Sequence, residues 1–501
     1  MKNNHDLNQS AVSQPDVIVM QTETPLKKTL SWLFENKVML MFAALCIGAV
    51  AVSGNTVGFV LGNVLIRFGR NGFTVLSLLI PVLAGMGLNF SIVIGAIAAQ
   101  TGLFFAVDWG LTGMTGMLVA FLITTPLTML FGFGVGRLFN KMKGAEMIAG
   151  LILGYFADGL YQLFFLYILG GILPVRTNSL VIPGGIGIKN TIDLTGNMKY
   201  ALDLVKLVDL VLALAVLLAI IAIIQIVARR KNGQPFPVKT LVLLVLAALI
   251  YGLTFIPAVG DYFRTDRLPI VSTIEMGAAI AVLYAVWKLV SHKLRPDGKF
   301  RVRRCLMIIG VAAALYASTY IPLVYSIIKN ASIAVLPFAL IAGLCVFNKV
   351  FLSTRLGQNM RTVGQSQVIA NASGIHVDRV RVIAMIMSTV LAGWGQLIYL
   401  QNLGTFATYG AHLQVGQFAI AALLVGGASV QKATNKQAIT GIILFHTLFI
   451  VAPEAGAKLF NNAMIGEYFR VFVSYGVIAL SLAMHAWQRK TKPALKLEMP
   501  D

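Results

Sequence analysis

Polar side chains occur within several of the long apolar stretches of this chain. Asp158 and Gln162 are four residues apart in the stretch 145–170, so they would share one face of a helix. Such groups are costly in hydrocarbon, and they tend to face a cavity. An aromatic side chain can stack on a sugar or base, while nearby amide side chains form hydrogen bonds with the hydroxyl groups of that solute. The candidates for binding a polar solute are Asn89, Gln100, Tyr155, Asp158, Gln162, Trp394, Gln396 and Gln401.

A second interpretation of these groups is hydrogen bonding between helices, which uses the same residue types. Asp158 is the strongest single candidate for solute contact. Glu146 follows a basic loop and is expected to act as a gate or to pair with Lys143.

The elements that must position these residues are membrane helices. The chain has 501 residues, of which 57% are hydrophobic and 12% charged, whereas soluble domains have about 25% charged residues. Apolar runs this long and continuous indicate helices, because barrel strands alternate and are shorter. The expected fold is an all-α polytopic membrane bundle, with apolar segments near 38–53, 56–69, 73–87, 89–107, 112–136, 145–170, 204–228, 239–257, 272–290, 305–328, 332–350, 379–400, 414–430, 436–452 and 467–487.

One helix in the region 54–107 is expected to be discontinuous. If every apolar segment there crossed the membrane, Arg137 and the lysines after it would lie on the wrong side. The region is rich in glycine, and broken helices are where transporters place substrate sites. Ordinary glycine-mediated helix packing is the alternative.

The net charge of +21 invites a nucleic-acid interpretation, which the distribution of the cations excludes. They lie in short loops between apolar runs, as the positive-inside rule describes for the cytoplasmic face. We therefore expect a cytoplasmic tail at 1–36, a transmembrane domain at 37–487 with basic cytoplasmic loops near 229–239 and 291–304, and a cytoplasmic tail at 488–501. The scattered histidines and cysteines predict neither a metal site nor a disulfide framework.

A polar segment, residues 351–378, separates two apolar stretches and is called the polar island below. Ser366 is a good N-cap and Gly374 a good residue to follow a helix end, so they predict a short helix between them. A first short helix is expected from Thr354 to Thr362, and Asp378 is expected to cap the next membrane helix. The guanidinium groups of Arg355 and Arg361 have the geometry to donate paired hydrogen bonds to carboxylates, so the island would dock on a partner with an acidic groove. An amphipathic turn resting on lipid headgroups is the alternative.

The motifs of the island resemble those of permease subunits of ABC importers for simple sugars, nucleosides and branched-chain amino acids. The pattern is carried by Arg355, Gly357, Arg361, Val363, Gly364, Ala370, Gly374 and Ile375, followed by Ser388, Leu391, Ala392, Gly393 and Gly395. The segments 85–95, 137–155 and 416–427 also resemble sequences of this family, but less specifically than the island does. The family often has an acidic residue where this chain has Ser366–Ala370.

The resemblance implies that the island is a coupling helix for an ATP-binding-cassette subunit. Arg355, Gly357, Arg361, Gly364, Ala370, Gly374 and Ile375 would form the coupling surface. It also implies a second permease copy or a homologous permease, an extracytoplasmic solute-binding protein and a location in the cytoplasmic (inner) membrane. The solute would be a sugar or nucleoside, or a branched-chain amino acid.

No phosphate-binding loop occurs in the sequence, since the Gly298–Lys299 pair lacks the upstream glycine and the following hydroxyl residue. ATP would therefore be hydrolysed by a separate subunit, and no cofactor is expected. Two alternatives remain open. One is an ion-coupled secondary transporter with Asp158 as its coupling acid, and the other is a membrane-embedded scaffold or enzyme.

Overall fold

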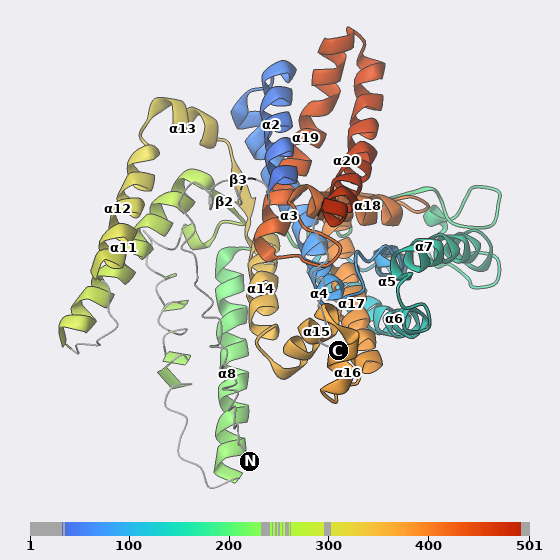
Figure 1. Cartoon of the computed structure of the whole chain (residues 1–501), viewed down its shortest axis with the longest axis horizontal. Coiled ribbons are helices and arrows are strands. Elements are labelled where there is room, and N and C mark those ends of the chain that lie inside the picture. The colour runs from blue at the N-terminus through green and yellow to red at the C-terminus, as the bar shows by residue number, and fades with distance from the viewer. Residues whose placement is uncertain are drawn as a thin grey trace, which may run out of the picture.

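A computed structural model describes Leu33, residues 36–231, scattered positions between 241 and 263, and residues 264–294 and 302–491. The expected tails, the apolar stretch 239–257 and the basic loops near 229–239 and 291–304 lie largely outside the described residues. Long helices dominate the described part (Figure 1). Seven are long and apolar enough to cross a membrane, or up to nine if each bent pair is one span. The expected all-α membrane bundle is confirmed.

The first two apolar helices are α2 (Lys37–Ser53) and α3 (Val57–Ser77), and α3 continues through Leu78 into α4 (Leu79–Leu83). The expectation of separate segments at 56–69 and 73–87 is therefore wrong, because they form one span. The intervening glycines allow close packing on α14 (Val335–Phe351), since a Cβ on Gly72 would lie 2.8 Å from Ile341. With α3 and α4 counted as one, four apolar helices lie between Lys37 and Lys141, and this even number removes the conflict in charge placement.

The expected discontinuity lies between α4 and α5 (Ile92–Asp108). Residues 84–91 form no helix, and two glycines within them have left-handed backbone conformations, with φ of 75° at Gly85 and 73° at Gly87. Met86, Leu88 and Asn89 are buried. This break is packed on protein, which is the condition under which non-helical backbone is tolerated in a membrane bundle.

The middle of the chain is less regular. The single segment expected at 305–328 is bent by 82°, between α12 (Val302–Ser318) and α13 (Pro322–Ile328), because Pro322 starts the second helix. Two short antiparallel strand pairs join distant loops, β1 (Thr191–Asp193) with β4 (Thr405–Ala407) and β2 (Arg267–Pro269) with β3 (Ser332–Ala334). The remaining elements are α6 (Gly113–Lys141), α7 (Glu146–Leu163) with its π-helical end (Phe164–Ile168), a 3₁₀ turn (Asn178–Leu180), α8 (Leu207–Lys231), α11 (Ile270–Leu294), α13 (Pro322–Ile328) and α14 (Val335–Phe351).

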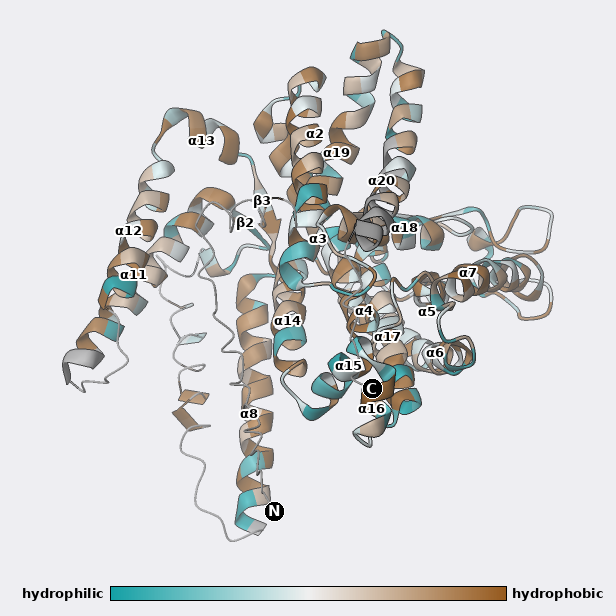
Figure 2. Cartoon of the chain, in the orientation of Figure 1, coloured by the Kyte–Doolittle hydropathy of each residue, from teal (hydrophilic) through white to brown (hydrophobic). Residues whose placement is uncertain are grey.

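The core forms around α17 (Val377–Leu403), which packs against α3, α5 and α6. It is followed by α18 (Ala411–Val425), α19 (Asn435–Phe460) and α20 (Ala463–Thr491), and α19 packs against α2, α3 and α20. Apolar side chains also cover the outward surface, most evidently on α8 (Figure 2). An apolar exterior of this extent is suited to lipid or to other membrane subunits.

Candidate functional site

The polar island folds into two short helices, α15 (Arg355–Gln365) and α16 (Gln367–Ala372), as expected. The Ser366 hydroxyl caps α16 by accepting a hydrogen bond from the Ile369 amide at 3.3 Å, and Gly374 has φ of 75°. The capping role expected of Asp378 is wrong. Helix α17 begins earlier, at Val377, so the Asp378 carboxylate lies in its first turn and contacts Lys143 instead.

Helix α15 is seated on the break between α4 and α5. A Cβ added to Gly364 would lie 2.2 Å from the Leu83 carbonyl oxygen, so only glycine allows this approach. Met360 and Val363 are buried in an apolar cluster with residues of α4, α6 and α17, including Ile80, Val135 and Met385. A displacement of α15 would therefore act directly on the α4–α5 break.

The island also presents a surface that no described part of the chain covers. Val368 and Ile369 on α16 are 79% and 62% exposed, and the side chains of Arg355 and Arg361 are exposed as well. Exposed polar residues flank this small apolar tip in the chain, namely Gln365, Asn371 and Ser373, and α16 as a whole mixes apolar and polar residues (Figure 2). Of the other expected coupling residues, Gly374 is exposed, Gly364 and Ile375 are half-buried, and Gly357 and Ala370 face the interior of the chain.

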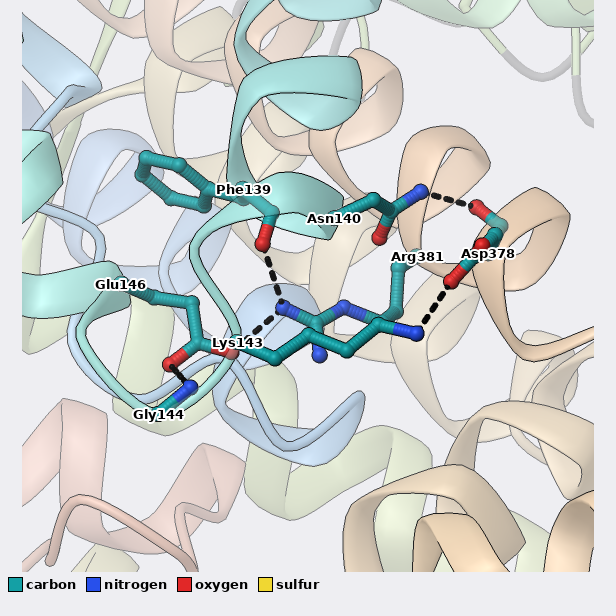
Figure 3. A network of polar contacts seen from close by, with 7 residues as sticks. All are labelled: Phe139, Asn140, Lys143, Gly144, Glu146, Asp378 and Arg381. Carbon is teal, nitrogen blue, oxygen red and sulfur yellow. Dashed lines mark hydrogen bonds and ion pairs between the residues drawn. The ribbon is translucent and has the colours of Figure 1, made fainter.

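An ion-pair network joins the island end of α17 to the α6–α7 loop (Figure 3). Nη2 of Arg381 lies 2.5 Å from Oε1 of Glu146 and donates to the Phe139 carbonyl oxygen at 3.2 Å. The other carboxylate oxygen of Glu146 accepts from the Gly144 amide. Lys143 pairs with Asp378 at 2.7 Å. The expected pairing of Glu146 with Lys143 is therefore wrong, and whether Glu146 acts as a gate stays a prediction.

Sequence reasoning missed Arg381 because it grouped this residue with the basic loop. A usable signal was available, since Arg381 shares a helix face with Met385 and Ser388 and should be buried with them. A buried arginine requires an acidic partner, and Glu146 is the nearest candidate at the end of an adjacent apolar helix.

A second network lies inside the bundle and contains three expected residues. His412 on α18 is completely buried between Gln100 of α5 and Asp158 of α7. Its Nδ1 lies 2.9 Å from Gln100 Oε1, and its Nε2 lies 2.7 Å from Asp158 Oδ1. Gln162 donates to the other oxygen of Asp158 at 3.0 Å. The Asp158–Gln162 contact follows the expected helix spacing, whereas His412 was not recognised as a site residue.

A third network holds the far end of α17. Gln401 donates to Asp203 at 2.7 Å, and Asn402 also donates to Asp203. Asn402 in turn accepts a hydrogen bond from Nε of Arg70 at 2.7 Å. Gln401 therefore lies in a structural junction, with Asp203 and Arg70 as partners that sequence reasoning did not identify.

The other candidates are dispersed. Asn89 accepts from Ser91 and donates to Ser388, and Trp394 donates to Thr125 at 3.0 Å. Gln396 is buried with no hydrogen-bond partner in the part of the chain that the structure describes. Tyr155 is exposed on the outer face of α7. The structure thus brings together Gln100, Asp158 and Gln162 and leaves the remaining candidates apart.

A cavity of about 430 Å³ between α18, α19 and α20 has the aromatic and amide lining that a polar solute would require. The Tyr475 hydroxyl donates to Gln417 at 3.1 Å, and the rings of Phe418 and Phe449 are 4.9 Å apart. None of these residues was expected from the sequence. Across the described residues, no group of three His, Cys, Asp or Glu side chains could hold a metal ion.

Comparison with known proteins identifies the family. The sequence profile of the family described as "Branched-chain amino acid transport system / permease component" matches residues 212–482, slightly more than half of the chain, including the polar island. The chain is also 25% identical over 150 residues to the "Nucleoside ABC transporter permease protein NupB" of Lactococcus lactis subsp. cremoris (strain MG1363). That similarity covers 29% of this chain and 38% of the relative.

No solved structure matches the chain. The family match and the apolar helices favour a permease over the ion-coupled carrier, the scaffold and the enzyme considered from the sequence. The chain therefore belongs to the family of branched-chain amino acid transport system permease components, the non-enzymatic membrane components of ABC transporters.

Proposed function

We propose that this chain is the membrane subunit of an ABC importer that moves a nucleoside or sugar, with a separate ATPase bound at the polar island. One observation carries the proposal. The helices α15 and α16 expose a small apolar tip and two arginines, while their opposite side is seated on the α4–α5 break. A surface that is open on one side and tightly packed on the other is suited to passing on the motion of a bound partner.

The motion of a bound partner would pass from α15 to the α4–α5 break and from the break to α17, because these parts are in direct contact. Gly364 of α15 lies against the carbonyl of Leu83, at the start of the break. Asn89, at the other end of the break, is hydrogen bonded to Ser388 of α17. Movement of α15 would therefore shift residues 84–91 and α17 together, and with them the packing between α3, α5 and α6.

The solute would pass along the polar face of α7. Asp158 and Gln162 lie one turn apart there, and Tyr155 points outward from the same helix. Because most of the surface of α7 is exposed, a second permease copy or a homologous permease would complete the pathway. The relative whose name specifies a nucleoside supports that solute class, and the family description keeps a branched-chain amino acid as a further candidate.

The distribution of cations supports a cytoplasmic position for the island. Arg137, Lys141, Lys143, Arg355 and Arg361 all lie at the end of the bundle formed by the island and the α6–α7 loop. By the positive-inside rule this end faces the cytoplasm, together with both termini. The location would be the cytoplasmic (inner) membrane, and the solute-binding protein would approach the opposite end.

The apolar tip provides the sharpest test. The double variant Val368→Asp/Ile369→Asp should abolish copurification with the co-expressed ATPase subunit and ATP-dependent solute uptake, because two carboxylates would occupy a desolvated contact. Membrane insertion should be unaffected, since both side chains are exposed. The matched control is Gln431→Asp, an exposed position between α18 and α19.

The proposal fails if the double variant keeps the ATPase bound and transports normally. It also fails if uptake into proteoliposomes needs only a proton gradient and no ATPase. Uptake of labelled uridine, ribose and leucine by the complete transporter would distinguish the solute classes.

A further inference from the structure

A groove lined by cations lies at the island end of α6 and α17. It has a volume of about 620 Å³ and is lined by Arg137 and Lys141 of α6 and by Arg379 of α17, among other residues. All three side chains are exposed, and none forms an ion pair with a carboxylate among the described residues. The carboxylate at the rim, Asp378, is already paired with Lys143. The groove therefore has uncompensated positive charge.

An apolar groove continues from the cationic one. It has a volume of about 430 Å³, and almost all of its exposed lining is carbon. Ile386 of α17 lines both grooves, and Leu340, Gly343 and Phe347 of α14 form the opposite wall of the apolar one.

The residues along both grooves follow helical spacing. On α6, Met129, Phe133 and Arg137 are four residues apart and share one face. On α17, Ile386 and Trp394 lie on one face, with Arg379 nearer the island. The two grooves therefore form one slot, which is cationic at the island end and apolar toward the middle of the bundle.

We propose that this slot binds one anionic phospholipid, with its phosphate among Arg137, Lys141 and Arg379 and an acyl chain between α14 and α17. Basic pockets between helices at a membrane surface bind acidic headgroups, and the apolar continuation distinguishes a lipid from a free phosphate ion. The guanidinium of Arg137 lies 4.6 Å from the centre of the Phe133 ring, which also lines the cationic groove and positions the guanidinium there.

The lipid would lie beside the contacts that hold the island end of α17. Arg379 is two residues from Arg381, whose partner is Glu146, and it is next to Asp378, whose partner is Lys143. An occupied slot would therefore join α6 to α17 on the membrane-facing side of this network and stabilise their arrangement.

The headgroup half of the slot can be tested with the full-length chain in detergent by native mass spectrometry. Added phosphatidylglycerol should be retained as a single adduct, and phosphatidylcholine should be retained much more weakly. In Arg137→Gln/Arg379→Gln, retention of phosphatidylglycerol should fall at least tenfold. The matched control Lys432→Gln/Lys436→Gln removes the same charge from two exposed positions, one in the loop before α19 and one in its first turn, and it should bind as the parent does.

The apolar groove, which is proposed to hold the acyl chain, can be tested independently. A Cβ added to Gly343 would meet no heavy atom within 4 Å, so Gly343→Leu fills the slot without a clash inside the chain. It should weaken phosphatidylglycerol binding severalfold and leave the thermal unfolding midpoint unchanged. Gly310→Leu on α12 is the matched control, since that glycine also has open space around it and lies away from the slot.

Two outcomes would overturn the proposal. If inorganic phosphate competes fully at millimolar concentration and Gly343→Leu has no effect, the slot is a site for a free anion. If the parent chain retains no lipid, and Gly343→Leu instead separates a dimer into monomers, the slot is an interface between copies of this chain.

Discussion

The two ends of α17 are both held by buried charged groups, but they are held differently. At the far end the Asp203 carboxylate accepts hydrogen bonds from two amide side chains, and Arg70 reaches it through Asn402. At the island end a single ion pair joins Arg381 to Glu146. The Nε and Nη1 atoms of Arg381 are buried with no hydrogen-bond partner among the described residues. The far end is the better satisfied of the two.

This difference assigns different tasks to the two ends. A buried polar group with unused donors is costly, so a rearrangement that supplies partners to Arg381 would be favourable. A junction whose members are all hydrogen bonded has little to gain from moving. We therefore infer that α17 is anchored at its far end and changes its contacts at the end that carries the island.

The largest effect is expected from Arg381→Met, which would leave the Glu146 carboxylate buried without its partner. Removing one member of a buried pair costs about 3–5 kcal/mol, so the thermal unfolding midpoint in detergent should fall sharply. The double variant Glu146→Leu/Arg381→Met should recover much of that loss, because no charge remains unpaired. Equal losses in the single and double variants would show that the unpaired Glu146 carboxylate carries no penalty, and would contradict this explanation of the loss.

An intermediate effect is expected from Asp203→Asn at the far end. Hydrogen bonds to a charged group contribute about 1.5–3 kcal/mol, and the amide would retain some of these contacts. The unfolding midpoint should fall less than in Arg381→Met, while ATP-dependent uptake by the remaining folded protein is preserved. The control is Asp209→Asn, an exposed position in the first turn of α8. A loss of uptake in well-folded Asp203→Asn would contradict the anchoring role.

The smallest effect is expected from Lys143→Gln. This pair is largely in solvent, with side chains 41% and 65% exposed for Lys143 and Asp378. Exposed ion pairs contribute about 0–1 kcal/mol, so the unfolding midpoint should barely change. A drop comparable to that of Arg381→Met would mean that the outer pair, not the buried one, holds the island end.

The fold class and the island could be predicted from the sequence because they depend on local patterns. Apolar runs indicated the helices, and Ser366 and Gly374 marked the limits of α16. The division at 56–69 and 73–87 was wrong because glycine density does not distinguish a turn from a close helix contact, which is what Gly72 makes with α14.

The networks could be predicted only where both partners lie on one helix. Asp158 and Gln162 were paired by their spacing. His412, Asp203 and Arg381 find their partners on other helices, 254, 198 and 235 residues away in the chain. Apart from the helix-face position that indicates burial of Arg381, the sequence offered no signal for these contacts between helices, and the polar candidates were therefore expected to converge more than they do.

The most direct test measures the two ends of α17 in the same molecule. Cys46, Cys305 and Cys345 would be replaced by alanine. Spin labels would then be placed at the exposed pair Met142 and Gln365 near the island, and separately at Leu204 and Leu403 near the far end. Distances would be measured by electron paramagnetic resonance in the reconstituted complex with its ATPase subunit, with and without ATP. We predict that ATP shifts the Met142–Gln365 distance and leaves the Leu204–Leu403 distance unchanged. A shift at the far end with no change at the island would contradict it.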